Sequence, residues 1–456
     1  MLCLYLRAEE ERLNEFSVSY KSTIHISDIV FLFFSVFAFL VAYVVGESEA
    51  TIAILFVVSL VVLYMSDISR LSDPRVLITG FFFLYQTWFP LKIIFFGDSY
   101  MHKISSDKLS DGLLLSLFAY VVIANILNFM VRQLSNGWDS IYVHFERERL
   151  SEKIVFFFSC ILGMASIVSF ITSGVTSKRE ILDGYGALSL FSYICMVFIT
   201  VNFLLRMARS RRGRFFEDGY VCVSLGIIVL YTGVAGERDV LFRAIVCLAI
   251  IYYEKSHSFG YTKFFIMLVA AAFVVPFSQL FKSVFLVGLQ DGSWQDVEIF
   301  GNEFISASRN LHYLLEFGVD HSWLHLLNDL LRAIVPSVLL PGLSVESTSS
   351  WYNGTYRVVH GFDGTSGWGF GLVAEGYLVA GYFGVFVVTA ICTTIVGLIY
   401  RVRLRSSHHF VLYILSLTVF IYVLRADVAN FISQIFKIFG VCFLVFFVAN
   451  LLMRKA

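Results

Sequence analysis

Long apolar stretches recur along this chain and constrain its fold more than any other feature. Of its 456 residues, 58% are hydrophobic, only 15% are charged, and 48 are phenylalanine. A soluble protein of this length cannot bury so much apolar surface. A helix of about 20 apolar residues crosses a bilayer core of roughly 30 Å and pairs its own backbone polar groups. The sequence therefore predicts an all-α, polytopic membrane protein.

Twelve stretches are predicted to be transmembrane helices. They lie near residues 29–45, 51–65, 76–95, 109–131, 154–173, 187–205, 217–234, 240–253, 264–281, 376–400, 409–424 and 430–452. No internal repeat of fixed period and no low-complexity linker divides them. We therefore predict a single integral membrane domain over residues 1–456. No cleavable signal is expected, because the first 28 residues hold four glutamates and no apolar core.

The basic residues are distributed unevenly between the two sides. With both termini cytoplasmic, the inner segments carry 21 Lys and Arg and the outer segments carry 10. The positive-inside rule favours this orientation. It places one long polar segment, residues 283–372 between the ninth and tenth spans, outside. In a bacterium, the expected location is the cytoplasmic (inner) membrane, with this large loop in the periplasm.

Charge and cysteine usage narrow the function. The net charge is zero, so the basic inner loops report topology and no nucleic-acid partner is expected. All seven cysteines lie in predicted spans or at Cys3, which excludes a disulfide in the outer loops and a metal site of cysteine type. No cofactor is expected.

The long external loop is predicted to be partly helical. Residues 302–317 carry apolar side chains at helical spacing, which predicts an amphipathic helix. Residues 323–335 are strongly apolar but too few to span, and prolines follow them at 336 and 341. This pattern favours a helix lying in the membrane interface. From Pro341 to Trp368 the composition is rich in Gly, Ser, Thr and Tyr, so we expect an irregular functional loop there.

Arginines are scarce on the outer side. They are Arg179, Arg238, Arg309, Arg332, Arg357 and Arg425. One such residue alone is readily explained as a snorkelling or ion-paired side chain. Because guanidinium groups bind phosphate oxygens bidentately and stay charged in a partly dry site, several together favour an anionic ligand. We predict that the substrate is bound by Arg179, Arg238, Arg309, Arg357 and Arg425.

Two basic residues fall inside predicted spans. Arg243 follows Asp239 by four residues, so we predict a structural ion pair on one helix face. No role is predicted for Lys437.

Three residues are candidate general bases. Glu375 stands where a glycine-rich run enters the tenth span, a place where a carboxylate is unfavourable unless it pairs with an arginine or serves in proton transfer. His360 has a suitable unperturbed pKa of about 6.5, although a lone loop histidine is usually a surface hydrogen-bonding group. Asp363 lies in the same run. We rank Glu375 first, His360 second and Asp363 third.

Several signatures of other enzymes do not occur in this sequence. It contains no Asp-x-Asp, no Walker A motif and no Gly-x-Ser-x-Gly. Nucleotide-driven transport, serine hydrolysis and metal-dependent transfer from nucleotide sugars therefore lose support.

The run from Gly369 to Gly384 resembles a pattern found in Wzy-type O-antigen polymerases, which join oligosaccharide repeat units. In that family a glycine-rich outer loop leads into Ala-Glu-x-Tyr-x-x-x-Gly-x-x-Gly at a span entrance, here Ala374 to Gly384. Three further segments resemble features of the family: Gly236-Glu-Arg238, the outer loop with Arg179 ahead of Gly184, and Leu424-Arg-Ala-Asp427. The twelve spans and the late position of the long loop are also similar.

This resemblance implies a metal-independent membrane glycosyltransferase of the polytopic type C class. The substrates would be glycans carried on undecaprenyl diphosphate in the lipid bilayer, and the product an O-antigen or related surface polysaccharide. The growing chain would move onto the non-reducing-end sugar of a new unit at a periplasmic site. Fixed guanidinium groups would stabilise the departing diphosphate. A chain-length regulator is the partner that the resemblance suggests.

Two alternatives remain open. An O-antigen ligase performs the same chemistry with a lipid A-core acceptor and uses an Arg/His pair in the long loop, for which Arg357 and His360 are the candidates here. A transporter or flippase of lipid-linked sugars would have more charge buried mid-span and smaller outer loops.

Overall fold

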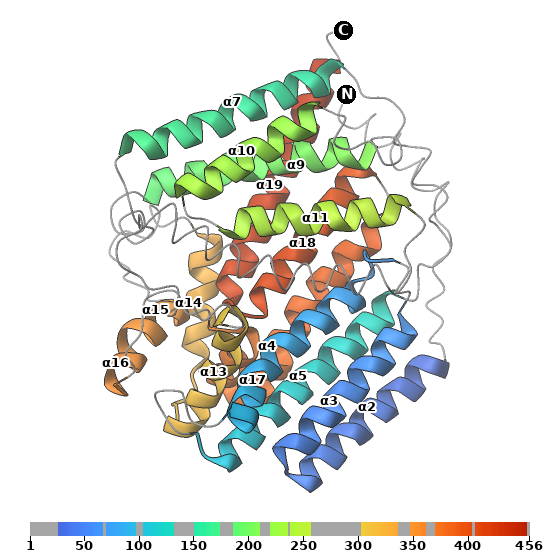
Figure 1. The fold of residues 1–456 in the computed structure, drawn as a ribbon, viewed down its shortest axis with the longest axis vertical. Helices are drawn as coiled ribbons and strands as arrows, with labels where there is room; N and C mark the ends of the chain where they lie inside the picture. Colours follow the sequence, from blue (N-terminus) through green and yellow to red (C-terminus); the bar gives the residue numbers. More distant parts are fainter. Residues whose placement is uncertain are drawn as a thin grey trace.

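The computed structural model describes residues 26–66, 70–96, 104–131, 150–173, 186–209, 219–235, 238–256, 302–335, 347–361, 370–403 and 406–453. Within these ranges the secondary structure is entirely helical (Figure 1), which confirms the predicted fold class. The helices are α2 (Ile26–Val45), α3 (Ser48–Met65), α4 (Pro74–Phe96), α5 (Ser106–Val131), α7 (Leu150–Ser173), α9 (Gly186–Arg209), α10 (Gly219–Ala235), α11 (Arg238–Ser256), α13 (Asn302–Phe317), α14 (Trp323–Ile334), α15 (Thr348–Trp351), a π-helical turn (Tyr352–Tyr356), α16 (Arg357–Val359), α17 (Leu372–Val402), α18 (Ser407–Val423) and α19 (Val428–Met453).

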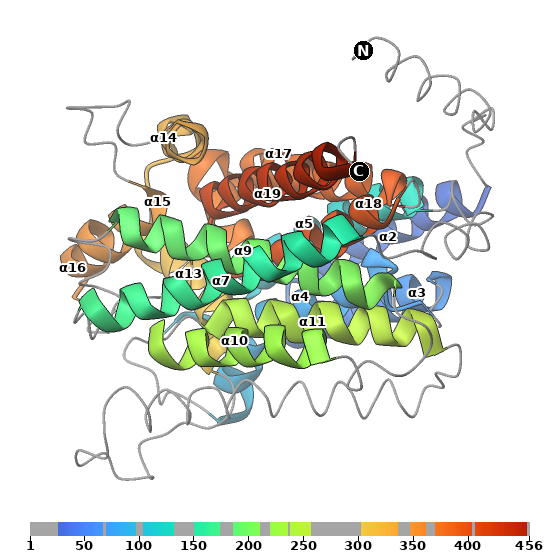
Figure 2. The ribbon, with the colours of Figure 1, turned by 90° about the horizontal axis from the view of Figure 1, so that it is seen from above.

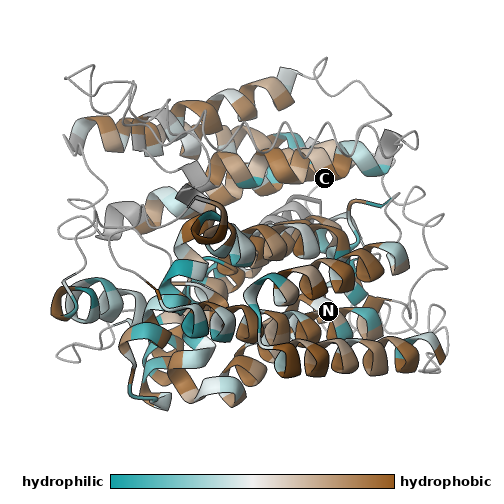
Figure 3. Cartoon of the chain, turned by 60° about the horizontal axis from the view of Figure 1, so that its bottom comes forward, coloured by the Kyte–Doolittle hydropathy of each residue, from teal (hydrophilic) through white to brown (hydrophobic). Residues whose placement is uncertain are grey.

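Eleven of the twelve predicted spans coincide with helices, and the other, residues 264–281, lies outside the described residues. In the described part of the chain, seven helices are long and apolar enough to cross a membrane: α2, α3, α4, α5, α7, α9 and α17. Shorter apolar helices come from α10, α18 and α19. Figure 3 shows hydrophobic residues along the length of the helices, with hydrophilic residues gathered towards their ends. These findings confirm a polytopic membrane protein.

The helices pack in two groups, and a pair of helices, α18 and α19, lies between these groups. Helices α2 to α5 pack with one another and with α17, while α7, α9, α10 and α11 form a second layer (Figures 1 and 2). Helices α18 and α19 connect them, because both contact α9 and α17. The loop helices α13 to α16 gather at one end of this bundle.

Loops that were assigned to the outer side meet at that end. The Ser110 hydroxyl at the start of α5 donates to the Gly46 carbonyl after α2, at 2.7 Å. Ser105 donates from its backbone N–H to Glu316 of α13, at 3.0 Å. At the opposite end, the Ser72 N–H donates to Glu254 near the end of α11, and the Ser72 carbonyl accepts from the Tyr413 hydroxyl of α18. The two ends of the bundle thus carry the two predicted sets of loops.

Helix α13 has the predicted bounds, but several of its polar side chains, among them Ser308, Asn310 and His312, are buried as well as its apolar ones. The Ser308 hydroxyl donates to the Gln86 carbonyl of α4, at 2.9 Å. The ring nitrogens of His312 lie 2.7 and 3.2 Å from the carbonyl oxygens of Ser308 and Leu109, and the ring rests on Gly112 of α5, where any Cβ would collide with it. Burial lowers the pKa of His312. Helix α13 is therefore an internal packing element of the bundle and not a helix with one wet face.

The second predicted loop helix, α14, is amphipathic. Leu326 and Asp329 are buried, on the side that packs against α17 and α19. The exposed apolar side chains are Trp323, Leu324, Leu327, Leu331 and Ile334. Such a helix suits the membrane interface, and that location remains a prediction.

The expectation of an irregular loop from Pro341 to Trp368 is wrong for residues 348–359, which are helical. Ser347 caps this segment by accepting the Ser350 N–H, at 3.1 Å. The rings of Tyr352 and Tyr356 stack with centroids 5.6 Å apart. Contacts between aromatic side chains, which a composition rich in Gly, Ser and Thr did not reveal, stabilise the helical turns.

The tenth span is also not the single helix predicted for residues 376–400. Its helix starts at Leu372 and is broken at Ala380 (φ −162°, ψ 39°) and Gly381 (φ 59°, ψ −138°). A Cβ on Gly384 would lie 2.1 Å from the Gly376 carbonyl oxygen, whereas in a straight helix these residues are about 12 Å apart. The chain therefore folds back at Gly381, and residues 372–379 form a separate short helix packed on the start of residues 382–402.

Candidate active site at the loop-helix end of the bundle

Glu375 lies in this short helix and is fully buried. Its Oε2 accepts a hydrogen bond of 2.7 Å from the backbone N–H of Val428, the first residue of α19. Its Oε1 accepts no hydrogen bond from the described residues. Gly371, at φ 95°, lets the chain enter the helix close against Ala307 of α13. Of the two roles considered for Glu375, pairing with an arginine is not observed among the described residues, where its hydrogen bond comes from a backbone amide.

Two further carboxylates lie near Glu375 and interact with it electrostatically, Asp329 of α14 and Asp427 before α19. Both are buried. Asp329 accepts the Thr348 N–H at 3.0 Å, and Asp427 accepts the N–H and the side-chain amide of Asn430, at 2.8 and 2.7 Å. We call Asp329, Glu375 and Asp427 the carboxylate cluster. Within the described residues it is not a group that could hold a metal ion.

The electrostatics of this cluster suit proton transfer. Burial raises the pKa of Asp329 to about 6, and Asp427 adds to the increase, while Arg332 acts in the opposite direction. Burial also raises the pKa of Asp427, against its hydrogen bonds from Asn430. A carboxyl group whose pKa is raised to about 6, as that of Asp329 is, exchanges protons close to neutral pH, as general acids and bases must.

Two of the predicted arginines, Arg309 and Arg357, interact electrostatically with Tyr352. Burial raises the pKa of Tyr352, and the guanidinium groups of Arg309 and Arg357 oppose that change. The Tyr352 hydroxyl donates to Asn310 Oδ1, at 3.1 Å. Arg357 is buried and donates to Asn353 Oδ1, at 3.5 Å. Arg309 and Arg357, distant in sequence, are thus brought to one place.

Arg425 belongs to a second group of cations. Its guanidinium lies 5.2 Å from the centroid of the Tyr422 ring, and that of Arg243 lies 5.4 Å from the same ring. Arg243 also donates to the Tyr193 hydroxyl at 3.3 Å, and Lys437 lies 5.0 Å from the Tyr193 ring centroid. The two in-span cations thus contact tyrosines. The predicted Arg243–Asp239 pair remains a prediction, because the Asp239 side chain is outside the described residues.

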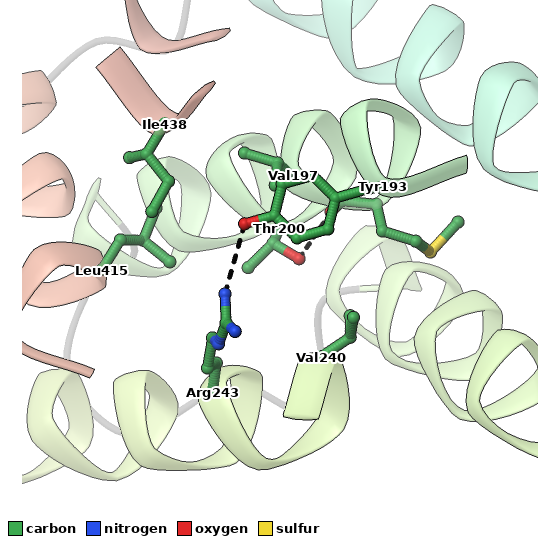
Figure 4. A pocket seen from close by; sticks show the side chains of 8 residues that line it. Tyr193, Val197, Thr200, Val240, Arg243, Leu415 and Ile438 are labelled. Carbon is green, nitrogen blue, oxygen red and sulfur yellow. Dashed lines mark hydrogen bonds between the residues drawn. The ribbon is translucent and has the colours of Figure 1, made fainter. Parts of the chain in front are cut away.

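Arg243 borders a small cavity of about 20 Å³ among α9, α11, α18 and α19. Figure 4 shows its guanidinium pointing across this cavity towards Tyr193. The remaining lining is largely apolar, with Val197, Leu415 and Ile438. A cavity of this volume holds about one water molecule, so it is not a substrate site.

His360 lies at the end of α16, among aromatic rings. Its ring centroid is 4.5 Å from that of Tyr356 and 4.9 Å from that of Phe317. Arg179 and Asp363 lie outside the described residues, as does the side chain of Arg238, which begins α11. Of the two candidate bases that the structure describes, Glu375 is the one that lies with other buried carboxyl groups.

Asp329 was not among the residues singled out from sequence. A signal was present, because it is the one carboxylate in the largely apolar run of residues 323–335. Asp427 was noted as part of the Leu424-Arg-Ala-Asp427 segment but given no role. The sequence did not indicate a role for Asp329 or Asp427, because it is the fold that brings α14 and the turn before α19 close to Glu375.

Residues 342–455 match the family model described as O-antigen polysaccharide polymerase Wzy. The match confirms the resemblance to Wzy-type polymerases over this part of the chain, and it supports an O-antigen polymerase activity, a glycosyltransferase-like function, in general terms. It includes Glu375, Asp427, Arg357 and Arg425 and excludes Arg309. No curated protein and no solved structure matches the chain.

Proposed function

We propose that this chain polymerises oligosaccharide repeat units carried on undecaprenyl diphosphate, transferring the growing chain onto the non-reducing-end sugar of a new unit. One observation carries the proposal. Glu375, inside the range matched by the polymerase family, is fully buried in the carboxylate cluster at the loop-helix end of the bundle. A buried carboxylate whose hydrogen bond from the described residues comes from a backbone amide and not from a cation is unfavourable without a role in chemistry.

In this reaction the bond between the anomeric carbon and the diphosphate oxygen breaks, and a bond to the acceptor hydroxyl oxygen forms. The acceptor proton passes to Glu375, whose Oε1 accepts no hydrogen bond from the described residues. Asp329 and Asp427 set the electrostatic environment of this group. The leaving undecaprenyl diphosphate carries away the negative charge that develops.

Arginines bind that diphosphate. Arg309 and Arg357, together at Tyr352, and Arg425, close in sequence to Asp427, are the described candidates, and Arg179 and Arg238 complete the proposed set. Arg→Lys keeps a charge but loses the bidentate fork. We expect Arg309→Lys and Arg425→Lys each to lower polymerisation at least tenfold in properly inserted protein. Normal polymer from Arg→Ala at two or more of these positions would contradict the proposal.

No metal is needed in this scheme, because fixed guanidinium groups neutralise the diphosphate. The purified protein should retain its rate in EDTA. The site faces the periplasm, and a chain-length regulator is the proposed protein partner.

Deletion of the gene tests the function and separates it from the alternatives. Lipopolysaccharide carrying a single repeat unit on its core would identify a polymerase, whereas uncapped core would indicate a ligase or a flippase. Purified protein supplied with lipid-linked repeat units should then make polymer without any other protein. Failure of that reaction, with active protein confirmed by rescue of the deletion strain, would show that polymerisation requires a partner.

A further inference from the structure

Five aromatic and histidine rings follow one another across the loop helices. They are His325 of α14, Trp351 of α15, Tyr356 of the π-helical turn, His360 after α16 and Phe317 of α13. Successive ring centroids are 4.8, 5.2, 4.5 and 4.9 Å apart. We call these five residues the ring series.

The ring series is not an ordinary apolar core. His325, Trp351, His360 and Phe317 are each half-buried, and the neighbouring Thr355 is exposed. Tyr356 is buried and fixed, since its hydroxyl donates to the Gly318 carbonyl at 2.8 Å. The rings therefore present rigid, partly accessible faces, on helices that lie at the edge of the molecule in Figure 1.

Planar polar groups border the rings. The Asn353 side chain is held by its donation to the Ser349 carbonyl, at 2.8 Å, and it accepts from Arg357. Sugars combine apolar C–H faces with hydroxyl groups. Fixed aromatic faces beside a few placed polar groups are the kind of surface that binds such mixed molecules.

The ring series starts beside the carboxylate cluster. His325 precedes Asp329 by four residues on α14, so their side chains are neighbours on one helix face. Thr348, whose N–H bonds Asp329, precedes Trp351 by one helical turn. At a second point, Tyr356 interacts electrostatically with Tyr377, two residues after Glu375. A molecule lying on the rings thus ends close to Glu375.

We propose that the ring series is a glycan-binding subsite, which holds saccharide units of the chain next to the carboxylate cluster. This inference rests on the proposed polymerase function. The subsite binds the carbohydrate part of the substrate and needs neither the diphosphate nor the lipid tail.

The test uses carbohydrate without its lipid. Oligosaccharide released by mild acid from the lipopolysaccharide of the producing strain is titrated into detergent-solubilised full-length protein, and its Kd is measured by calorimetry. Trp351→Leu should weaken binding at least tenfold, and Trp351→Phe, which keeps a ring, by less than about threefold. The matched control is Trp323→Leu, because this tryptophan lies on the exposed apolar face of α14, 6.2 Å from the Phe383 ring and outside the ring series. Its Kd should be unchanged.

An unchanged Kd in Trp351→Leu, or an equal loss in the Trp323→Leu control, would overturn the subsite. Gel filtration and thermal unfolding show whether Trp351→Leu folds. If it does not, His325→Ala and His360→Ala are tested in its place, and normal Kd values in both would overturn the subsite. A different result would refute the proposed function, namely normal polymer in the deletion strain. Polymer lost on deletion with equal binding in all variants would refute the subsite alone.

Discussion

At the scale of single residues, substitution of Glu375 is the most direct test of the proposed general base. Glu375→Gln keeps the shape and an acceptor for the Val428 N–H, so the fold should persist. It removes the base, and we expect polymer to fall by at least a hundredfold, the low end of what general-base catalysis contributes. The measurement is a lipopolysaccharide gel from a complemented deletion strain, with protein level checked by immunoblot.

His360→Asn is the companion to this substitution. Because His360 lies in the ring series and not in the carboxylate cluster, partial activity should remain, with shorter chains. Full polymer from Glu375→Gln together with none from His360→Asn would reverse the two roles.

The raised pKa of Asp329 makes the free energy of unfolding depend on pH. Burial holds its pKa in the folded protein at about 6, above the value of about 4 expected in the unfolded chain. The folded state thus binds this proton more tightly, so its stabilising contribution is complete below about pH 4 and is lost as the pH rises through 6. Asp329→Asn keeps an acceptor for the Thr348 N–H and should raise the free energy of unfolding at pH 8 by on the order of 3 kcal/mol.

Thermal unfolding of the detergent-solubilised protein between pH 4.5 and 8 checks this expectation. The melting temperatures of wild type and variant should converge towards low pH and separate towards high pH. Parallel curves would show that the Asp329 carboxyl does not have a raised pKa. Polymer yield should decrease even though the protein is more stable, as when an active-site charge is removed.

Sequence reasoning identified Glu375 because a carboxylate at a span entrance is conspicuous by itself. It missed Asp329, although this residue contacts the same site, because its importance depends on α14 folding against α17 and α19. The arginines show the same limit. Their scarcity was visible, but the grouping of Arg309 with Arg357, and of Arg425 with Arg243, required the fold.

At the scale of elements, the glycine spacing in the short helix is explained by backbone contact. A Cβ at Gly376 would lie 2.6 Å from the Val385 Cα, and one at Gly384 would meet the Gly376 carbonyl. Gly384→Ala should therefore destabilise the protein by about 1–3 kcal/mol, as overpacking does, and displace Glu375. Loss of melting temperature and of polymer together is the expected result.

Gly440→Ala on α19 is the matched control, because no heavy atom lies within 4 Å of a Cβ placed there. It should leave both the melting temperature and the polymer unchanged. Equal behaviour of the two variants would argue against the close crossing at Gly384.

Elements with a strong local signal were predicted well. The bounds of α13 were predicted to the residue from its apolar spacing, and α14, which prolines follow, differs by one residue at its end. Residues 348–359 were missed, because their helical turns depend on ring contacts with α13 and α14 that no local pattern encodes. The break at Ala380–Gly381 was missed because apolar composition continues through it.

At the scale of the whole molecule, the two sets of loops lie at opposite ends, and the orientation of those ends remains to be tested. In a variant whose seven native cysteines are replaced, a cysteine at Thr355, an exposed position beside the ring series, should react with an impermeant thiol reagent in intact spheroplasts. The 21-to-10 distribution of basic residues is the physical reason. Labelling only after permeabilisation would place this end in the cytoplasm.

The fold-back at Gly381 has a consequence for how substrates meet. Residues 382–402 alone are about 31 Å long as a helix, enough for the hydrocarbon core, so we expect the preceding short helix with Glu375 to lie at the depth of the lipid head groups. In the proposed reaction, donor and acceptor both keep their tails in the leaflet and reach Glu375 by lateral diffusion. Their encounter rate is then set by the number of carrier lipids per unit area of membrane, so the length of the polymer should respond to the density of loaded carrier and not to its concentration in any aqueous volume.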